Sequence, residues 1–240
     1  MNKVLHHYDK NHLPISAERV IAKIMDLLSP KSVVDVGCGL AQWLKVFQNN
    51  GVEKVLGIDG SHVPMENFYI NQEDFFVYNL EKGNDFVINN KFDLAVSLEV
   101  AEHISEDGAD GFMKMLSSLS DRILFSAAIP NQTGENHINE QNHIYWQEKF
   151  LKHNYFMLDI IRPIIWSDEN INWWYRQNMF ILVKKDDILF NEDKVFNGNQ
   201  LIHPELFKMY VDSNKSLQKL LSNQKNIPTS FIGKLKFLIK

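Results

Sequence analysis

A short β-branched run followed by two glycines is the first feature that could bind a ligand. Residues 33–47 read VVDVGCGLAQWLKVF, in which Asp35 precedes Gly37 and Gly39. Glycine adopts backbone angles that other residues avoid, and it has no side chain to keep a ligand from the backbone. Because open α/β sheets bind ligands beyond the carboxyl ends of their strands, we expect a ligand-binding turn here.

A second acid ends the next apolar run, KVLGID. This residue, Asp59, lies about 20 residues after the glycine turn, where a carboxylate can accept hydrogen bonds from both hydroxyls of a ribose. Nicotinamide dinucleotides and S-adenosylmethionine both fit this arrangement. However, Gln42 occupies the third glycine position of the dinucleotide motif, and Asp35 would repel a pyrophosphate but attract a cationic amino acid. We therefore predict S-adenosylmethionine, with an NAD-dependent oxidoreductase as the alternative.

Residues that could move a proton follow two later apolar runs. In FDLAVSLEVAEHI, Glu99 comes at the end of the run, where it could face the cofactor, and His103 comes four residues later. In HINEQNH, His137 is followed by Glu140. Histidine is suited to removing a proton near neutral pH. His103 and His137 are therefore the candidate catalytic bases, with Glu140 as an orienting residue or an alternate base.

The segment HINEQNH also predicts substrate contacts but no metal site. Nearly all of its side chains form hydrogen bonds, so Asn139 and His143 are candidate substrate-binding residues; a solvated loop is the alternative. His137 and His143 are six residues apart with Glu140 between them, and this is not a recognised ligand spacing. We therefore predict that the chain binds no metal.

The segment WWYRQN, residues 173–178, gathers aromatic and polar side chains just before the last apolar run. Tyr175 could stack on a sugar or nucleotide, and Arg176 could bind a phosphate through two hydrogen bonds. Both are candidate substrate-binding residues, although packing in the core or in an interface is the alternative for the aromatic residues.

Positioning these residues requires a scaffold that brings strand ends together. Mostly apolar strands that alternate with helices predict an α/β fold with a sheet covered on both faces. The apolar spacing also predicts a helix over Ser16–Leu28, with Ser16 available to cap it, and a helix over Pro204–Leu221 outside the repeat. The predicted strands cover residues 32–36, 54–58, 75–79, 92–98, 121–127, 156–162 and 179–185.

Over about residues 32–185, the chain resembles the class I S-adenosylmethionine-dependent methyltransferases. VVDVGCG looks like their first motif, LGIDGS like their second and FDLAVSLEVAEHI like their fourth. The resemblance implies a Rossmann-like, doubly wound, seven-stranded sheet whose last strand is antiparallel. It also implies these cofactor contacts: Gly37 and Gly39 with the methionine portion, Asp59 with the ribose, and Asn79 and Leu80 with the adenine.

Three later segments, LFSAAIP, HINEQNHIYW and WWYRQN, resemble a group associated with capsule or O-antigen biosynthesis. The resemblance implies O-methylation of a sugar or nucleotide-sugar. N-methylation of a small amine and a non-catalytic binding module are the alternatives. We expect a methyltransferase domain with an N-terminal helix over residues 1–190 and a C-terminal helical extension over residues 191–240.

Composition narrows the partners and the location. The net charge of −5 predicts no nucleic-acid partner, and no apolar run reaches the roughly 18 residues that a membrane span needs. The single cysteine, Cys38, and a polar N-terminus without a signal-like apolar core predict a cytoplasmic protein. The last ten residues, FIGKLKFLIK, suggest a weak membrane-surface contact. A homodimer could form through the aromatic segment or the terminal helix.

Overall fold

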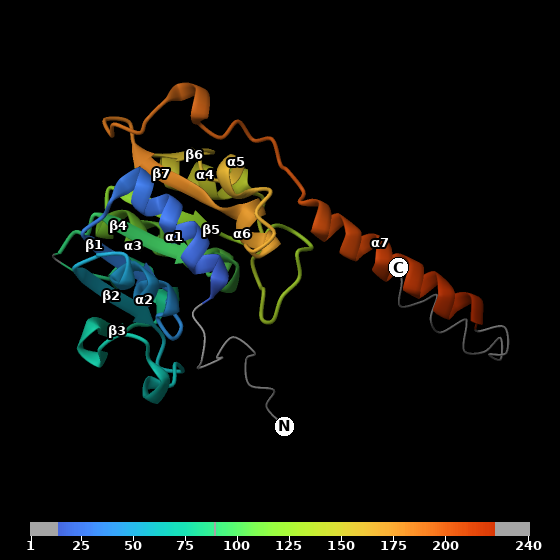
Figure 1. Cartoon of the computed structure of the whole chain (residues 1–240), viewed down its shortest axis with the longest axis horizontal. Coiled ribbons are helices and arrows are strands. Elements are labelled where there is room, and N and C mark those ends of the chain that lie inside the picture. Colours follow the sequence, from blue (N-terminus) through green and yellow to red (C-terminus); the bar gives the residue numbers. More distant parts are fainter. Residues whose placement is uncertain (1–13, 89, 224–240) are drawn as a thin grey trace. The chain divides into compact units, whose positions relative to one another are not determined.

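Seven strands form one sheet in the computed structural model, which describes residues 14–88 and 90–223 (Figure 1). The strands are β1 Ser32–Val36, β2 Lys54–Asp59, β3 Phe75–Val77, β4 Leu94–Leu98, β5 Arg122–Ser126, β6 Tyr155–Leu158 and β7 Phe180–Lys184. The α-helices are α1 Ile15–Leu28, α2 Gln42–Asn49, α3 Glu106–Leu119, α4 His143–Leu151, α5 Arg162–Ile165, α6 Trp173–Asn178 and α7 Pro204–Asn223. Short 3-10 helices are η1 Met65–Asn67, η2 Gln72–Asp74, η3 Leu80–Asp85, η4 Ala101–His103 and η5 Glu192–Lys194.

The sheet has the strand order β3-β2-β1-β4-β5-β7-β6. Neighbouring strands from β3 to β5 pair in parallel, so the carboxyl ends of β1, β2, β4 and β5 meet at one edge. β7 runs antiparallel to both β5 and β6. The predicted seven-stranded α/β sheet with an antiparallel last strand is therefore confirmed.

Successive strand residues point into two separate cores, one on each face of the sheet. Val33 packs with α1 and α2 on one face, whereas Val34 packs with α3 and α4 on the other. The helices accordingly cover both faces (Figure 1). Because both sides of the strands are buried, they read as continuous apolar runs rather than as alternating ones.

Several element ends differ from the predictions. β6 ends at Leu158 rather than at residue 162, since Arg162 begins α5 with a proline in its first turn. Ser16 does not cap α1: Pro14 is the N-cap residue, and the Ser16 hydroxyl accepts a hydrogen bond from the backbone N–H of Asn172 at 2.9 Å. The segment WWYRQN forms helix α6, which the sequence pattern did not predict.

The chain divides into two units after Leu201, eleven residues beyond the predicted boundary at 190. The reason is that the segment after β7 returns to the edge strand β6. The backbone N–H of Asp159 donates to the carbonyl of Lys194 at 2.9 Å, and that of Phe196 donates to the carbonyl of Met157 at 2.8 Å. These bonds attach the segment to the first unit.

The second unit contains the predicted terminal helix, here α7. The helices of the described chain include none with the length and apolar character that a membrane crossing requires. The proposed membrane-surface contact of residues 231–240 lies outside the described residues.

Candidate active site

The glycine turn lies at the carboxyl end of β1. Gly37 has a φ of +84° and Gly39 has a φ of +52°, which is a conformation that other residues rarely adopt. A Cβ atom at Gly37 would overlap the side chain of Val100, so only glycine lets the turn approach the loop after β4. A Cβ at Gly39 would meet no described atom within 4 Å. The turn is therefore open to a ligand at Gly39.

Asp35 and Asp59 place two buried carboxyl groups beside this turn. Asp59 accepts hydrogen bonds from the backbone N–H groups of Gly39 at 2.8 Å and Gly60 at 2.6 Å. A carboxylate has about four acceptor positions, so these bonds leave capacity for ribose hydroxyls. Burial, together with the nearby charge of Asp59, raises the pKa of Asp35 to about 8. A cationic ligand would stabilise this pair of acids, so the site fits the amino-acid portion of S-adenosylmethionine.

The predicted adenine contacts follow β3. The backbone N–H of Tyr78 donates to the carbonyl of Asp59 at 2.8 Å, which fixes this segment beside the end of β2. Asn79 is exposed and caps η3 by accepting a hydrogen bond from the backbone N–H of Glu81 at 3.1 Å. Leu80 is half-buried against the core. Contact of Asn79 and Leu80 with the adenine remains a prediction.

Glu99 follows β4 in a left-handed conformation with a φ of 56°. Its backbone N–H donates to the carbonyl and hydroxyl oxygens of Ser126 at 3.0 and 3.1 Å. Its carboxylate accepts from the side-chain amides of Gln132 at 2.8 Å and Asn178 at 3.3 Å. Burial raises the pKa of Glu99, and these side-chain bonds partly offset that effect. Surroundings that hold a residue in an unfavourable conformation are common at functional sites.

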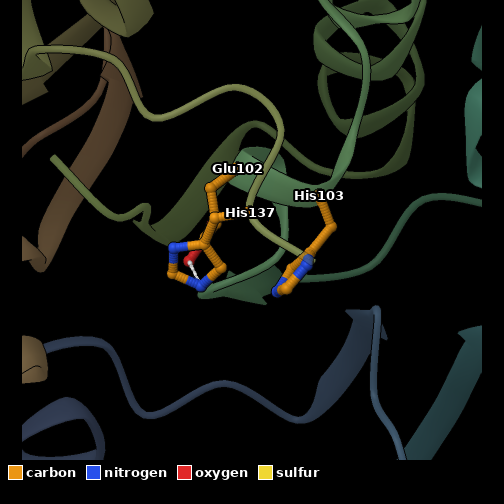
Figure 2. A group of neighbouring side chains, drawn as sticks. All are labelled: Glu102, His103 and His137. Atoms are coloured by element: carbon orange, nitrogen blue, oxygen red, sulfur yellow. Dashed lines mark ion pairs between the residues drawn. The ribbon is translucent and has the colours of Figure 1, made fainter. Parts of the chain in front are cut away.

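Glu102, His103 and His137 come together at the end of β4 (Figure 2). The first two belong to η4, and His137 comes from the loop between β5 and α4. The two imidazole rings have centroids 4.9 Å apart and are nearly perpendicular. Nε2 of His137 lies 4.0 Å from Oε1 of Glu102. The structure therefore joins the two histidines that the sequence offered as separate candidates for the base.

Glu140 fixes the orientation of His137. Nδ1 of His137 lies 2.8 Å from Oε1 of Glu140. The same oxygen accepts from the backbone N–H of Thr133 at 2.8 Å, and Oε2 accepts from that of Asn131 at 2.7 Å. Because a carboxylate only accepts, Nδ1 carries a proton, and in the neutral ring Nε2 carries the lone pair. This geometry is the one expected for an orienting residue.

Glu102 is the site residue that sequence reasoning missed. Its side chain is 0% exposed, and neither carboxylate oxygen makes a hydrogen bond of normal geometry within the described residues. Burial and nearby Glu99 raise the pKa of Glu102 well above its ordinary value, although its own backbone amide and that of Ala128 lower it in part. Its position next to His103 is a signal in the sequence, but the sequence does not show that this glutamate is fully buried.

The two predicted substrate residues of the loop have different positions. The backbone N–H of Asn139 donates to the carbonyl of Glu102 at 3.0 Å, so Asn139 lies near the site. His143 is 1% exposed and packs in the core against Phe180, with Nε2 3.2 Å from Oδ1 of Asn178. Burial lowers the pKa of His143 to about 3, with a further contribution from Arg162. The structure therefore does not support substrate contact for His143, because its side chain belongs to the core.

Tyr175 and Arg176 lie in α6 and do not form an exposed patch. Tyr175 is half-buried and packs edge-to-face with Trp43, with ring centroids 5.2 Å apart. Burial raises the pKa of Tyr175, and the charge of nearby Glu99 raises it further. Arg176 is 3% exposed and donates to the carbonyl of Trp166 at 3.2 Å. Its burial does not support the predicted phosphate contact.

Solved structures share this fold at low sequence identity. The methyltransferase domain of a bacterial CtHen1 is 16% identical, has a TM-score of 0.53, and the match covers 72% of this chain and 99% of that chain. Magnesium protoporphyrin IX methyltransferase from Synechocystis PCC 6803, with bound S-adenosylhomocysteine, is 14% identical with a TM-score of 0.52, and the match covers 77% and 90%. A search of curated proteins finds no match.

A family model described as a methyltransferase domain matches residues 8–183, which is most of the chain. This match decides between the two cofactor classes that the glycine turn left open, and it replaces the alternative of an NAD-dependent oxidoreductase. The two acids beside the turn agree with it, since a cation would lower the raised pKa of Asp35, whereas a pyrophosphate would raise it further. The chain therefore belongs to the methyltransferase domain family and is an S-adenosylmethionine-dependent methyltransferase.

Proposed function

We propose that this enzyme methylates a hydroxyl group of a small polar acceptor, a sugar or nucleotide-sugar used in capsule or other surface-polysaccharide biosynthesis. The observation that carries the proposal is the His137–Glu140 pair, with its 2.8 Å contact, beside His103. A hydroxyl must lose its proton when it is methylated, and a carboxylate-oriented histidine promotes that loss. A neutral amine can attack without prior proton removal, so the pair favours O-methylation over N-methylation.

The cofactor side of the site follows from the glycine turn. S-adenosylmethionine supplies an activated methyl group on a sulfonium sulfur. We assign the ribose to Asp59, the methionine portion to Asp35, Gly37 and Gly39, and the adenine to Asn79 and Leu80, with Glu99 facing the cofactor. Holding the acceptor oxygen in line with the methyl group can contribute about 7–11 kcal/mol at the extreme, and proton removal typically adds about 10²–10⁴-fold in rate.

The acceptor class rests on the polar loop after β5 and on the resemblance to surface-polysaccharide enzymes. The loop brings Asn139 beside Glu102, and Tyr175 offers an aromatic side chain close to Glu99. These groups suit an acceptor with several hydroxyls, because each hydroxyl both donates and accepts hydrogen bonds. We place the reaction in the cytoplasm, where nucleotide-sugars would be the acceptors.

The test is formation of S-adenosylhomocysteine with a panel of nucleotide-sugars, free sugars and small amines, with mass spectrometry to find the acceptor that gains a methyl group. We expect turnover with a hydroxyl acceptor, and a loss of turnover in His137→Ala at unchanged S-adenosylhomocysteine affinity. Asp59→Ala should instead weaken S-adenosylhomocysteine binding. Methylation of amines alone, with every sugar inactive, would overturn the proposal.

A further inference from the structure

We propose that Glu102, His103 and His137 bind a divalent transition-metal cation on the acceptor side of the site. Each residue offers one ligand atom, and the three atoms lie within 4.8 Å of one another (Figure 2). The inference deepens the proposed function. It rests on that function for the use of the cation in methyl transfer, but not for the binding of the cation itself.

The carboxyl group of Glu102 is the first observation that indicates a ligand. The side chain is fully buried, and across the part of the chain that the structure describes, neither oxygen makes a hydrogen bond of normal geometry, although the backbone amides of Glu102 and Ala128 interact weakly with the carboxyl group. Buried polar groups are nearly always paired, so an exception calls for an explanation. A cation between Glu102 and the histidines would supply the missing partner.

Contacts of their Nδ1 atoms orient the two histidines as in metal sites. Nδ1 of His137 donates to Glu140 at 2.8 Å, and Nδ1 of His103 lies 3.2 Å from the carbonyl oxygen of Asn136. Since both partners only accept, the neutral form of each ring carries its proton on Nδ1 and its lone pair on Nε2. Histidine ligands of metals typically donate their other ring N–H to a carboxylate or a carbonyl, and both contacts have that form.

The ligand set indicates which cations would bind. Two imidazoles and one carboxylate suit first-row transition ions such as Mn²⁺, Co²⁺ and Zn²⁺ better than Mg²⁺ or Ca²⁺, which prefer oxygen. With metal–ligand bonds of about 2.1 Å, neighbouring ligand atoms lie about 3–3.5 Å apart, so the three side chains must close slightly around the ion. His103 is exposed and can make this adjustment.

Three protein ligands leave coordination positions for water or for an acceptor hydroxyl. A cation lowers the pKa of a hydroxyl that binds to it, and the proton can then pass to water. In this arrangement His103 and His137 promote loss of the hydroxyl proton through the cation that they hold, which replaces direct removal of the proton by His137. Glu140 retains its role, because it orients His137 in either case.

The test is Mn²⁺ titration of the chelator-treated full chain, with electron paramagnetic resonance measuring unbound Mn²⁺. The background carries His6→Ala, His7→Ala and His12→Ala, because these N-terminal histidines could bind cations by themselves. We expect one Mn²⁺ per chain, competition by Zn²⁺ and little competition by Mg²⁺. Glu102→Gln and His103→Ala should each weaken binding at least about 10-fold, and Glu140→Gln about 10–100-fold.

His153→Ala is the matched control, since His153 lies outside the cluster, and it should leave Mn²⁺ affinity unchanged. Two results would overturn the proposal: no saturable Mn²⁺ or Zn²⁺ binding by folded protein, or undiminished binding in His103→Ala. Because His103 is exposed, misfolding would be a poor explanation for the expected loss of binding in this variant. Titration of S-adenosylhomocysteine in the same samples separates the two proposals. If the protein binds S-adenosylhomocysteine but no metal, only the proposed metal site is refuted, and the proposed function stands.

Discussion

Asp35 retains a proton near neutral pH because it is buried beside Asp59, which raises its pKa to about 8. The positive amino group of S-adenosylmethionine would lower that pKa, since a nearby cation favours the carboxylate. Binding at pH 7 should therefore release up to one proton. Calorimetry in two buffers that differ in ionisation enthalpy measures this number. Asp35→Asn should release none, and the exposed control Asp26→Asn should behave like the parent protein.

The same pKa shift predicts how stability depends on pH without the cofactor. In the unfolded chain the Asp35 carboxyl loses its proton near its ordinary pKa of 3.8, whereas in the folded chain it keeps it until about pH 8. Between these values the folded state binds more protons, so this group makes stability fall as pH rises. Asp35→Asn should flatten that fall in a series of thermal melts. Parallel curves for the two proteins would contradict the assignment.

Among the elements, the loop between β5 and α4 contributes most to the acceptor side of the site. It carries both His137 and Glu140, and its backbone binds Glu140 at Asn131 and Thr133. Three of its non-glycine residues, Asn131, Thr133 and Asn136, have positive φ angles. The conformation of this loop is stabilised by its own hydrogen bonds rather than by those of a helix or a sheet. Local sequence patterns therefore do not predict it.

A substitution at Gly134 tests whether the position of the His137 ring matters for turnover. A Cβ atom at position 134 would overlap the imidazole ring of His137, so Gly134→Ala should displace that ring. A displacement of about 1 Å can cost about 10²-fold in rate, so turnover should fall by about that factor while S-adenosylhomocysteine affinity stays constant. Glu135→Ala, an exposed neighbour, is the control and should retain full turnover. Equal turnover in both variants would show that the ring position does not matter.

The sequence predicted the strands, whose residues are buried on both faces of the sheet. It missed features that depend on contacts with residues far away in the chain. β1 was readable because strands that are buried on both faces are continuously apolar and because Gly37 ends the strand. α6 was missed, since six residues are too few to show a helical period. His143 was predicted to face a substrate because it belongs to a polar segment, but it begins α4 and its side chain turns into the core.

In the molecule as a whole, the site lies where the strand order reverses. The chain winds outward from β1 to β2 and β3, then returns to place β4 on the other side of β1. The glycine turn after β1 and the Glu99–His103 segment after β4 therefore lie on either side of the point where the strand order reverses. Open α/β sheets bind their ligands at such a point. Motifs near the strand ends made the cofactor side predictable. The acceptor side needed the tertiary structure, because its loop joins β4 only through hydrogen bonds such as that between Asn139 and the carbonyl of Glu102.

Helix α7 carries an exposed apolar stripe that predicts self-association. Phe207, Leu217 and Leu221 are 65%, 57% and 57% exposed, and their spacing puts them on one face of the helix. Removing such a stripe from water is favourable by about 25 cal/mol per Å², so two copies of α7 should pair through it.

Sedimentation velocity over a range of protein concentrations should therefore show a monomer–dimer equilibrium. Replacing both leucines, Leu217→Lys and Leu221→Lys, should shift it to monomer without changing S-adenosylhomocysteine affinity, because neither residue is among those assigned to the cofactor. Lys208→Glu, on the polar face of α7, should leave the dimer intact. A parent protein that sediments as a monomer at every concentration would refute pairing through this stripe.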